Sequence, residues 1–290
     1  MHVRDTGSMR IALLQDTAVP LDLDHNLTLI ARAAEQAREH EAQLLLTPEL
    51  FSTGYAPALI REKITPHDVD AARARLARIA RDAGIALVHS LPGPGPAEAR
   101  PILGTLVSPT GQVLAEHTKI HLFGPEERAA FIPGEAAPPL AELHGLRLGL
   151  LVCYDVEFPE AMRHLGAAGA DVVLVPTALA GGFTGVTDTL IPARALENQL
   201  SVAYANHVGT EEGLDFDGRS VIAGPNGGVL ASAGTRPELL FAEVGGAQGG
   251  RTPEDSPAGP WYLQDRRPDV YQRWAPHRPD SDASPTPRPR

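Results

Sequence analysis

The sequence predicts a layered α/β domain built on a mixed sheet, and two observations carry that prediction. Short apolar runs, such as 44–46 and 172–175, alternate with segments in which apolar residues recur at helical spacing. Two pairs of strand-like runs are separated by the turn sequences Ser-Pro-Thr-Gly at 108–111 and Pro-Asn-Gly-Gly at 225–228, which predict antiparallel hairpins. Alternation of strand and helix favours parallel strands and the hairpins add antiparallel ones, so we expect helices packed on a sheet of both kinds.

The expected elements occupy most of the chain up to residue 245. Apolar and alanine positions at helical spacing predict helices at 24–40, 68–82, 159–168 and 188–199. Apolar runs predict strands at 10–14, 44–46, 85–88, 102–107, 113–118, 146–152, 172–175, 201–205, 219–223, 229–233 and 239–244. Gly84 follows the second helix and is expected to cap it, because glycine readily adopts the left-handed conformation at a helix end.

Composition excludes several classes of protein. The formal net charge of −11 repels phosphate backbones, and aromatic residues make up only 5% of the chain, so no nucleic acid partner is expected. No apolar run approaches membrane-spanning length, so no membrane association is expected either. The single cysteine, Cys153, excludes an intramolecular disulfide and a multi-cysteine metal site, and it favours a cytoplasmic location.

The two ends of the chain differ in composition from the rest. Residues 1–8 contain no apolar signal core and are expected to form a flexible leader before a catalytic domain at 9–245. After residue 245 Gly, Pro, Arg and Asp dominate, although Trp261, Tyr271 and Trp274 remain. We therefore expect an extension at 246–275 that packs on the body or on a partner subunit, and a disordered tail at 276–290.

Three predicted strands are followed by a residue with reactive chemistry. Glu49 follows strand 44–46, Lys119 follows strand 113–118, and Cys153 follows strand 146–152. Each could be an ordinary charge or a buried thiol, but α/β enzymes assemble their sites from such strand ends. Amide hydrolysis needs a thiol nucleophile beside a base, a proton donor for the leaving amine, and a cation for the oxyanion. The three residues together supply these groups.

The segments around these residues resemble the motifs of the nitrilase superfamily of carbon–nitrogen hydrolases. They are residues 48–55 (PELFSTGY), 119–124 (KIHLFG) and 153–160 (CYDVEFPE), with further similarity at 131–134, 194–199 and 205–206. The resemblance covers about residues 9–274. It implies a four-layer α-β-β-α sandwich, a Cys-Glu-Lys triad, no cofactor, no metal, and a homodimer or larger homo-oligomer.

Within this resemblance, Cys153 is the nucleophile, Glu49 the general base and acid, and Lys119 the oxyanion partner. The backbone N–H of Tyr154 is expected to complete the oxyanion hole. The family often adds a second glutamate that orients the lysine and the substrate amide, for which both members of the Glu126-Glu127 pair are available. Glu127 fits better, since it lies seven residues before the glycine of the Pro-Gly turn. Further residues expected to contact substrate are Tyr55, Tyr154, Glu157 and Thr177.

The expected substrate is a small aliphatic amide. Tyr154-Asp155 after the cysteine resembles the amidase and carbamoylase branches, and the wider pattern is similar to aliphatic ω-amino amidases such as 5-aminopentanamidase. Glu157 could pair with a substrate ammonium, although an acid at a helix start is also favoured by the helix dipole. Two alternatives remain: hydrolysis of an N-carbamoyl amine or amino acid, and a non-catalytic, redox-sensing thiol.

His117 and His121 are four residues apart and could suggest a metal pair. That spacing places two side chains on one face only in a helix, whereas the preceding residues have a strand pattern and Pro125 follows. We therefore interpret them as structural histidines beside Lys119.

Overall fold

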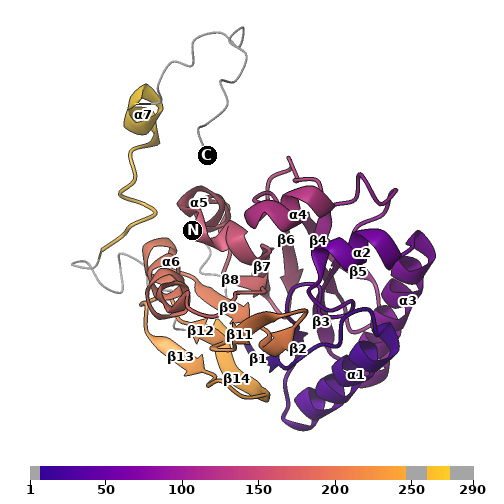
Figure 1. The fold of residues 1–290 in the computed structure, drawn as a ribbon. Coiled ribbons are helices and arrows are strands. Elements are labelled where there is room, and N and C mark those ends of the chain that lie inside the picture. Colours follow the sequence, from indigo (N-terminus) through magenta and orange to yellow (C-terminus); the bar gives the residue numbers. More distant parts are fainter. Residues whose placement is uncertain (1–6, 246–259, 275–290) are drawn as a thin grey trace, which may run out of the picture.

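The computed structural model describes residues 7–245 and 260–274, and its body consists of two six-stranded sheets that face each other (Figure 1). The strands of the first sheet, in spatial order, are β14 (Glu238–Gly245), β1 (Ser8–Gln15), β2 (Leu44–Leu46), β3 (Ala86–Pro92), β4 (Ile102–Val107) and β5 (Val113–Thr118). Those of the second are β13 (Val229–Ser232), β12 (Val221–Ala223), β9 (Ser201–Ala205), β8 (Val172–Pro176), β7 (Leu146–Leu150) and β6 (Leu140–Leu143). The predicted strands are all present: β2, β4, β5 and β9 have the predicted bounds, and the ends of the others are shifted.

Both sheets are mixed, as the pattern of strands and helices predicted. In the first sheet β1, β2 and β3 are parallel, because the helices α1 (Leu23–Glu39) and α3 (Pro66–Ala83) provide the crossovers between them. In the second sheet β7, β8 and β9 are parallel and are joined through α5 (Pro159–Ala167) and α6 (Ile191–Asn198). Hairpins and the antiparallel pairing of β1 with β14 complete the sheets.

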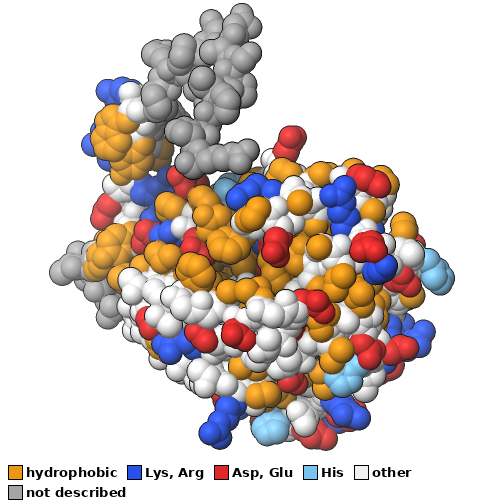
Figure 2. Space-filling model, viewed as in Figure 1, with side chains coloured by type: hydrophobic (Ala, Val, Ile, Leu, Met, Phe, Trp, Pro, Cys, Tyr) orange, Lys and Arg blue, Asp and Glu red, His pale blue; other side chains and the backbone are white. Residues whose placement is uncertain are grey.

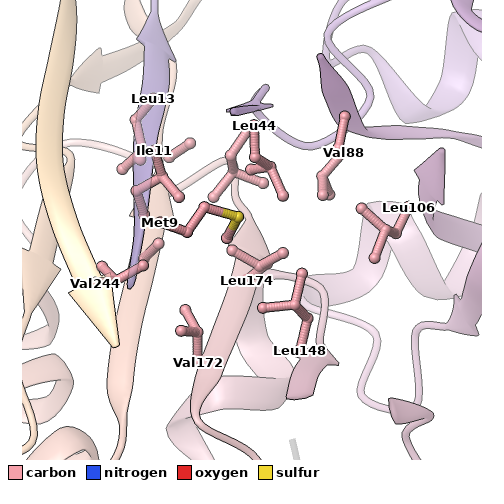
Figure 3. Close-up of a cluster of buried hydrophobic side chains, with 14 of the residues drawn as sticks. Met9, Ile11, Leu13, Leu44, Val88, Leu106, Leu148, Val172, Leu174 and Val244 are labelled. Carbon is pink, nitrogen blue, oxygen red and sulfur yellow. The ribbon is translucent and has the colours of Figure 1, made fainter. Parts of the chain in front are cut away.

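Three hydrophobic cores show that the elements form four layers. One core lies between the two sheets and includes Met9, Leu44, Leu148 and Leu174 (Figure 3). A second joins the outer face of the first sheet to α1 and α3, and a third joins the outer face of the second sheet to α5 and α6. The molecule is therefore the α-β-β-α sandwich that the family resemblance implied. Acidic and basic side chains are interspersed over its visible face (Figure 2).

Helix ends follow local chemistry. Thr65 and Asp68 form a capping box at the start of α3, in which each side chain accepts a hydrogen bond from the other's backbone N–H. Gly84 ends the same helix in the left-handed conformation, with φ of 69°, as predicted. The predicted helix at 188–199 is divided, because a π-helical turn, η2 (Val186–Leu190), precedes α6.

Several short elements were not predicted from the sequence. They are α2 (Pro57–Lys63), α4 (Gly124–Ala130), β6, and the two-stranded sheet of β10 (Val208–Glu211) and β11 (Leu214–Asp217). In addition, the strand predicted to reach residue 152 ends at Leu150, and a 3₁₀ helix, η1 (Cys153–Glu157), begins three residues later. All of these except β6 lie in the region of Glu49, Lys119 and Cys153.

The chain ends are described only in part. β1 begins at Ser8, inside the predicted leader, whose residues 1–6 lie outside the described residues. The predicted disordered tail and most of the first half of the extension also lie outside them. Within 260–274, Trp261 is buried, whereas the short helix α7 (Pro268–Tyr271) projects away from the body and is followed by η4 (Gln272–Trp274) (Figure 1). No helix in the described ranges is long and apolar enough to cross a bilayer.

Candidate active site

Lys119 lies at the centre of a buried charge cluster at one edge of the two sheets. Its ammonium donates to Glu49 Oε1 at 2.7 Å and to both Glu127 oxygens at 2.7 and 2.8 Å. All three side chains are completely buried. Lys119 directly follows β5 and Glu49 lies three residues after β2, so the contact joins residues 70 positions apart, from two strands that have β3 and β4 between them in the sheet. When both carboxylates are ionised, this buried cluster of one ammonium and two carboxylates carries a net negative charge.

Glu127, rather than its neighbour, is the second glutamate of this cluster. It lies in the first turn of α4, where the Phe123 N–H donates to its Oε2 at 2.7 Å. The Tyr55 hydroxyl donates to its Oε1 at 2.6 Å. Glu126 is exposed to solvent. Helical geometry explains the difference, because adjacent residues on a helix point about 100° apart and only one of them can face inward.

Cys153 occupies a strained turn beside the cluster. It begins η1 with φ of 47°, a left-handed conformation that residues with a Cβ rarely adopt, and its side chain is buried. Such strain concentrates at functional sites, and Cys153 lies between β7 and α5 in a strand–turn–helix geometry that can present a nucleophile. The first N–H groups of a helix have no partners within it, so the Tyr154 N–H lies beside the thiol as an available donor.

Burial sets the protonation states of the thiol and of Glu49. Burial raises the pKa of the Cys153 thiol well above its usual value, and the Glu49 carboxylate raises it further. Burial also raises the pKa of Glu49 to about 7, although Lys119 opposes the shift. The second oxygen of this carboxylate, Oε2, accepts no hydrogen bond from the described residues. The site therefore pairs a neutral thiol with a carboxylate that can exchange a proton near neutral pH.

The pKa of Lys119 is raised, even though burial by itself would lower it. The negative charge of Glu49 is the largest opposing influence, and the thiol and Glu127 add to it. The ammonium consequently stays charged at neutral pH. A permanent buried cation is what an oxyanion partner requires.

Backbone contacts hold the Lys119 segment in place. The Gly134 N–H donates to the Lys119 carbonyl at 2.8 Å. A Cβ on Gly134 would lie 2.6 Å from the Thr118 carbonyl oxygen, so only glycine allows this approach. The Pro-Gly turn at residues 133–134 therefore packs against Thr118 and Lys119 and helps to hold this segment in place.

Asp155 binds both histidines that flank Lys119. Its carboxylate contacts His117 Nε2 and His121 Nδ1, each at 2.9 Å, and accepts from the His121 N–H at 2.9 Å. The contacts to His117 and His121 help to hold the pKa of this carboxyl at about 2 in spite of its burial. β5 ends at Thr118, so the two histidines do not share a helix face, and in the described ranges no group of three or more His, Cys, Asp or Glu side chains is arranged so that it could hold a metal ion.

The other predicted substrate contacts lie around the thiol. Thr177, at the end of β8, lowers the thiol pKa through its side chain, although less than burial raises it. Tyr154 and Glu157 are half-buried on η1, and burial raises the pKa of the Glu157 carboxyl. Tyr55 is buried and reaches the cluster only through Glu127. Arg194 donates to the backbone carbonyls of Val156 and Glu157 in η1, which is a structural role.

Two pairs of residues in this region, one aromatic and one charged, were not predicted from the sequence. Exposed rings of Phe123 and Phe183 lie edge-to-face near Tyr154, and nothing in the local pattern indicated them. His207 and Glu211 are buried and bonded to each other beneath Glu49. His207 follows the end of β9 by two residues, and this position at a strand end was the available signal.

Comparison with known proteins identifies the family. A family model described as carbon-nitrogen hydrolase matches residues 10–253, so the chain belongs to the carbon–nitrogen hydrolase family, as its nitrilase-superfamily motifs predicted. A curated relative from Pseudomonas protegens, named "Hydrolase in pqqF 5′region", is 39% identical over 93% of both chains.

Solved structures narrow the class further. The chain is 53% identical to the amidase from Nesterenkonia sp. AN1 over 92% of this chain and 97% of that one. One structure, a mutant with the acetamide moiety of fluoroacetamide on its active-site cysteine, has a TM-score of 0.84. Another, a mutant in complex with butyramide, has a TM-score of 0.85. The present protein is an enzyme of the amidase type.

Proposed function

We propose that this protein hydrolyses small aliphatic amides to a carboxylic acid and ammonia through a thioester on Cys153. The observation that carries the proposal is the buried Lys119 ammonium, held between Glu49 and Glu127 beside a thiol at a strained turn. No residue of this set is solvated, so charge that develops on a substrate there is stabilised by fixed groups rather than by water.

In the first step the thiol adds to the amide carbonyl. Glu49 accepts the Sγ proton as sulfur bonds to the carbonyl carbon, which avoids a free thiolate that burial would disfavour. The carbonyl π-electrons move to oxygen, and the Lys119 ammonium and the Tyr154 N–H stabilise this oxyanion. Glu127 keeps Lys119 oriented.

In the second step the C–N bond breaks. The protonated Glu49 carboxyl gives its proton to the departing nitrogen, ammonia leaves, and the oxyanion electrons re-form the carbonyl of a thioester. Water then adds to this thioester while Glu49 takes one of its protons, and the C–S bond breaks with return of that proton to sulfur. A carboxyl whose pKa is about 7 suits both directions of transfer.

The substrate class rests on the relatives and on Glu157. The Nesterenkonia amidase has been solved with butyramide and with an acetamide adduct, which supports short aliphatic amides here. Glu157 is half-buried on the element that begins with Cys153, and in the described ranges its carboxylate has no ion-pair partner. We propose that it receives a distal ammonium of the substrate.

Ammonia release from a panel of amides tests the proposal. The panel contains acetamide, butyramide, 5-aminopentanamide and an N-carbamoyl amino acid. We expect turnover of the simple amides by the wild-type enzyme and nearly none by Cys153→Ala, with an unchanged circular dichroism spectrum. Intact-mass measurement after fluoroacetamide treatment should show an adduct that Cys153→Ala lacks.

The same panel decides between the alternatives. Turnover of the N-carbamoyl compound alone would reassign the enzyme to the carbamoylase branch. No turnover of any compound, together with reversible oxidation of Cys153, would instead support a redox-sensing thiol.

A further inference from the structure

A buried ion pair lies beneath the proposed catalytic set, and no step of the mechanism uses it. His207 and Glu211 are almost completely inaccessible to solvent, and His207 Nδ1 lies 2.6 Å from Glu211 Oε1. On the other side of the ring, His207 Nε2 lies 2.6 Å from the backbone carbonyl oxygen of Glu49. The rings of Phe51 and Phe216 pack against the imidazole.

The contacts determine the protonation of this pair. A carbonyl oxygen only accepts, so Nε2 must carry a hydrogen. The Glu211 carboxylate already accepts from the Ala18 N–H at 3.0 Å and the Tyr55 N–H at 2.8 Å, which is typical of an ionised group. Nδ1 therefore also carries a hydrogen, and the pair is imidazolium and carboxylate. The pKa of His207 is raised and the pKa of Glu211 is lowered, which agrees with this assignment. Burial disfavours both charged forms, but the opposite charge of the partner and the hydrogen bonds favour them more strongly.

One arm of this pair leads to the proposed base. The Glu49 carbonyl accepts from His207, while the Glu49 N–H donates to the Thr177 carbonyl at 3.1 Å. Both backbone groups of Glu49 are thus held by neighbouring segments. The next residue, Leu50, has φ of 52°, so the backbone here is strained and depends on such contacts.

The other arm leads to the second glutamate. Glu211 Oε2 accepts from the Tyr55 backbone N–H, and the Tyr55 hydroxyl donates to Glu127 Oε1 at 2.6 Å. Glu127 in turn holds Lys119. Glu49 is therefore bonded directly to the buried pair, through His207, and Glu127 is connected to it through Tyr55.

These contacts form a closed ring of hydrogen bonds through Lys119, the two glutamates, Tyr55 and the buried pair. We infer from it that the His207–Glu211 ion pair is a positioning element that sets the separation of the Glu49 and Glu127 carboxylates around Lys119. The inference rests on the proposed function for its catalytic consequence, since those carboxylates act on the reacting atoms there. A displacement of about 1 Å of a catalytic group can cost about 10²-fold in rate. The pair should thus affect kcat more strongly than KM.

Two substitutions at His207 separate the arms. The amide nitrogen of Gln reaches approximately the position of Nε2, so His207→Gln retains a donor for the Glu49 carbonyl. The amide nitrogen of Asn reaches approximately the position of Nδ1, so His207→Asn retains only the contact with Glu211. We expect kcat to fall about 10²-fold in His207→Asn and about tenfold or less in His207→Gln, with KM changed less than kcat in both.

A third variant tests the carboxylate, and a fourth serves as the control. The Glu211 carboxylate accepts hydrogen bonds on both of its oxygens, whereas the side-chain amide in Glu211→Gln has only one acceptor oxygen. At least one donor therefore loses its partner, and we expect kcat to fall at least tenfold. His89→Gln replaces another buried histidine, in β3, whose pKa burial lowers to about 3. It should lose stability but keep the wild-type kcat per folded molecule.

The measurements are kcat and KM on butyramide, the folded fraction from thermal melts, and the rate of Cys153 alkylation by fluoroacetamide from intact mass. Folded His207→Asn with kcat and alkylation rate within about twofold of wild type would overturn the inference. So would losses that follow the folded fraction alone, as in His89→Gln. If wild-type protein turns over no amide, the proposed function fails separately, and the order of the alkylation rates among the variants still decides the positioning role.

Discussion

Glu49 combines a carboxylate that can change its protonation state with a backbone that is hydrogen-bonded on both sides. Its N–H and carbonyl are bonded to Thr177 and His207, while its side chain shares Lys119 with Glu127. Burial raises the pKa of this carboxyl to about 7. A fixed group with a pKa near neutrality is what repeated proton transfer between sulfur and nitrogen requires.

We expect kcat/KM to rise with pH through an apparent pKa near 7. The sign follows from the proposed role of Glu49 as a base: only the ionised carboxylate can accept the thiol proton, so protonation below pH 7 should remove activity. Glu49→Gln should lower the rate by about 10² to 10⁴ and abolish this limb. A pH–rate profile of both proteins on butyramide measures the effect. A flat wild-type profile between pH 5.5 and 8.5, or a fully active Glu49→Gln, would contradict it.

Lys119→Arg should not rescue the site. The planar guanidinium is larger than an ammonium, and this buried position places three carboxylate oxygens around one nitrogen. We expect a loss of about 10² to 10³ in kcat, typical of a missing oxyanion donor. The chain's other lysine, the exposed Lys63, offers the control: Lys63→Arg should have wild-type kinetics. Comparable activity of the two variants would exclude the oxyanion role.

Glu157 should favour substrates with a distal ammonium. Its half-buried carboxylate can form a charge-assisted contact that a neutral amide of equal length cannot. Glu157→Gln should reduce the ratio of kcat/KM for 5-aminopentanamide over hexanamide about tenfold or more. Glu160→Gln, at an exposed position at the start of α5, should leave the ratio unchanged. Equal rates for both amides in wild type would leave the specificity unassigned.

At the scale of elements, Asp155 connects the turn that carries the thiol to the segment that carries Lys119. Its carboxylate lies on η1 but accepts from the ring of His117 in β5, and from the ring of His121 and two backbone N–H groups just after β5. The turn with the proposed nucleophile and the segment with the proposed oxyanion partner are therefore held together by one buried anion.

Asp155→Asn should lose stability mainly above pH 4. The pKa of this carboxyl is depressed from 3.8 to about 2, so its ionised form stabilises the fold by roughly 2 kcal/mol above the unfolded pKa. That contribution disappears as pH falls toward 2. Urea unfolding of both proteins from pH 2.5 to 7 should give free energies of unfolding that converge at the acid end. Curves that stay parallel over this range would show that the charge is not what stabilises the link.

At the scale of the whole molecule, the described part of the C-terminal extension, residues 260–274, lies on the body at Trp261 and away from it at α7. Trp261 is buried and the Pro260 carbonyl accepts from Gln199, whereas Trp274 is 69% exposed and packs with Tyr271 (Figure 1). An exposed aromatic pair on a projecting helix favours contact with another subunit. A homodimer or larger assembly therefore remains our prediction.

Truncation separates the two parts of the extension. Deleting residues 276–290 should change neither the melting temperature nor the mass in solution, because this stretch is polar and rich in proline. Deleting from residue 261 onward should lower the melting temperature or the mass measured by light scattering, since it removes Trp261 and the aromatic pair. Identical behaviour of the two truncated proteins would mean that residues 261–275 have no role in packing or assembly.

The sequence by itself determined the long elements and the chemistry at the strand ends. Helices such as α1 and α3 span several turns, so their apolar periodicity is unambiguous, and strands such as β2 and β8 are continuous apolar runs. Short elements such as α2, α4 and β10 were missed because they contain too few residues for a period to emerge. Motif order along the chain also indicated the family and the residues Glu49, Lys119 and Cys153.

Only the tertiary structure decided which groups touch. The sequence favoured Glu127 over Glu126 by its spacing to Gly134, but only the direction of α4 decided that the Glu127 side chain faces inward and binds Lys119. The bond from His207 to Glu49 joins residues 158 positions apart, and no local pattern encodes such a contact. Burial of these groups, and hence their pKa values, arises from the packing of the two sheets against each other. Local sequence sets which residues stand at the sheet edge, but long-range packing sets their distances and charges.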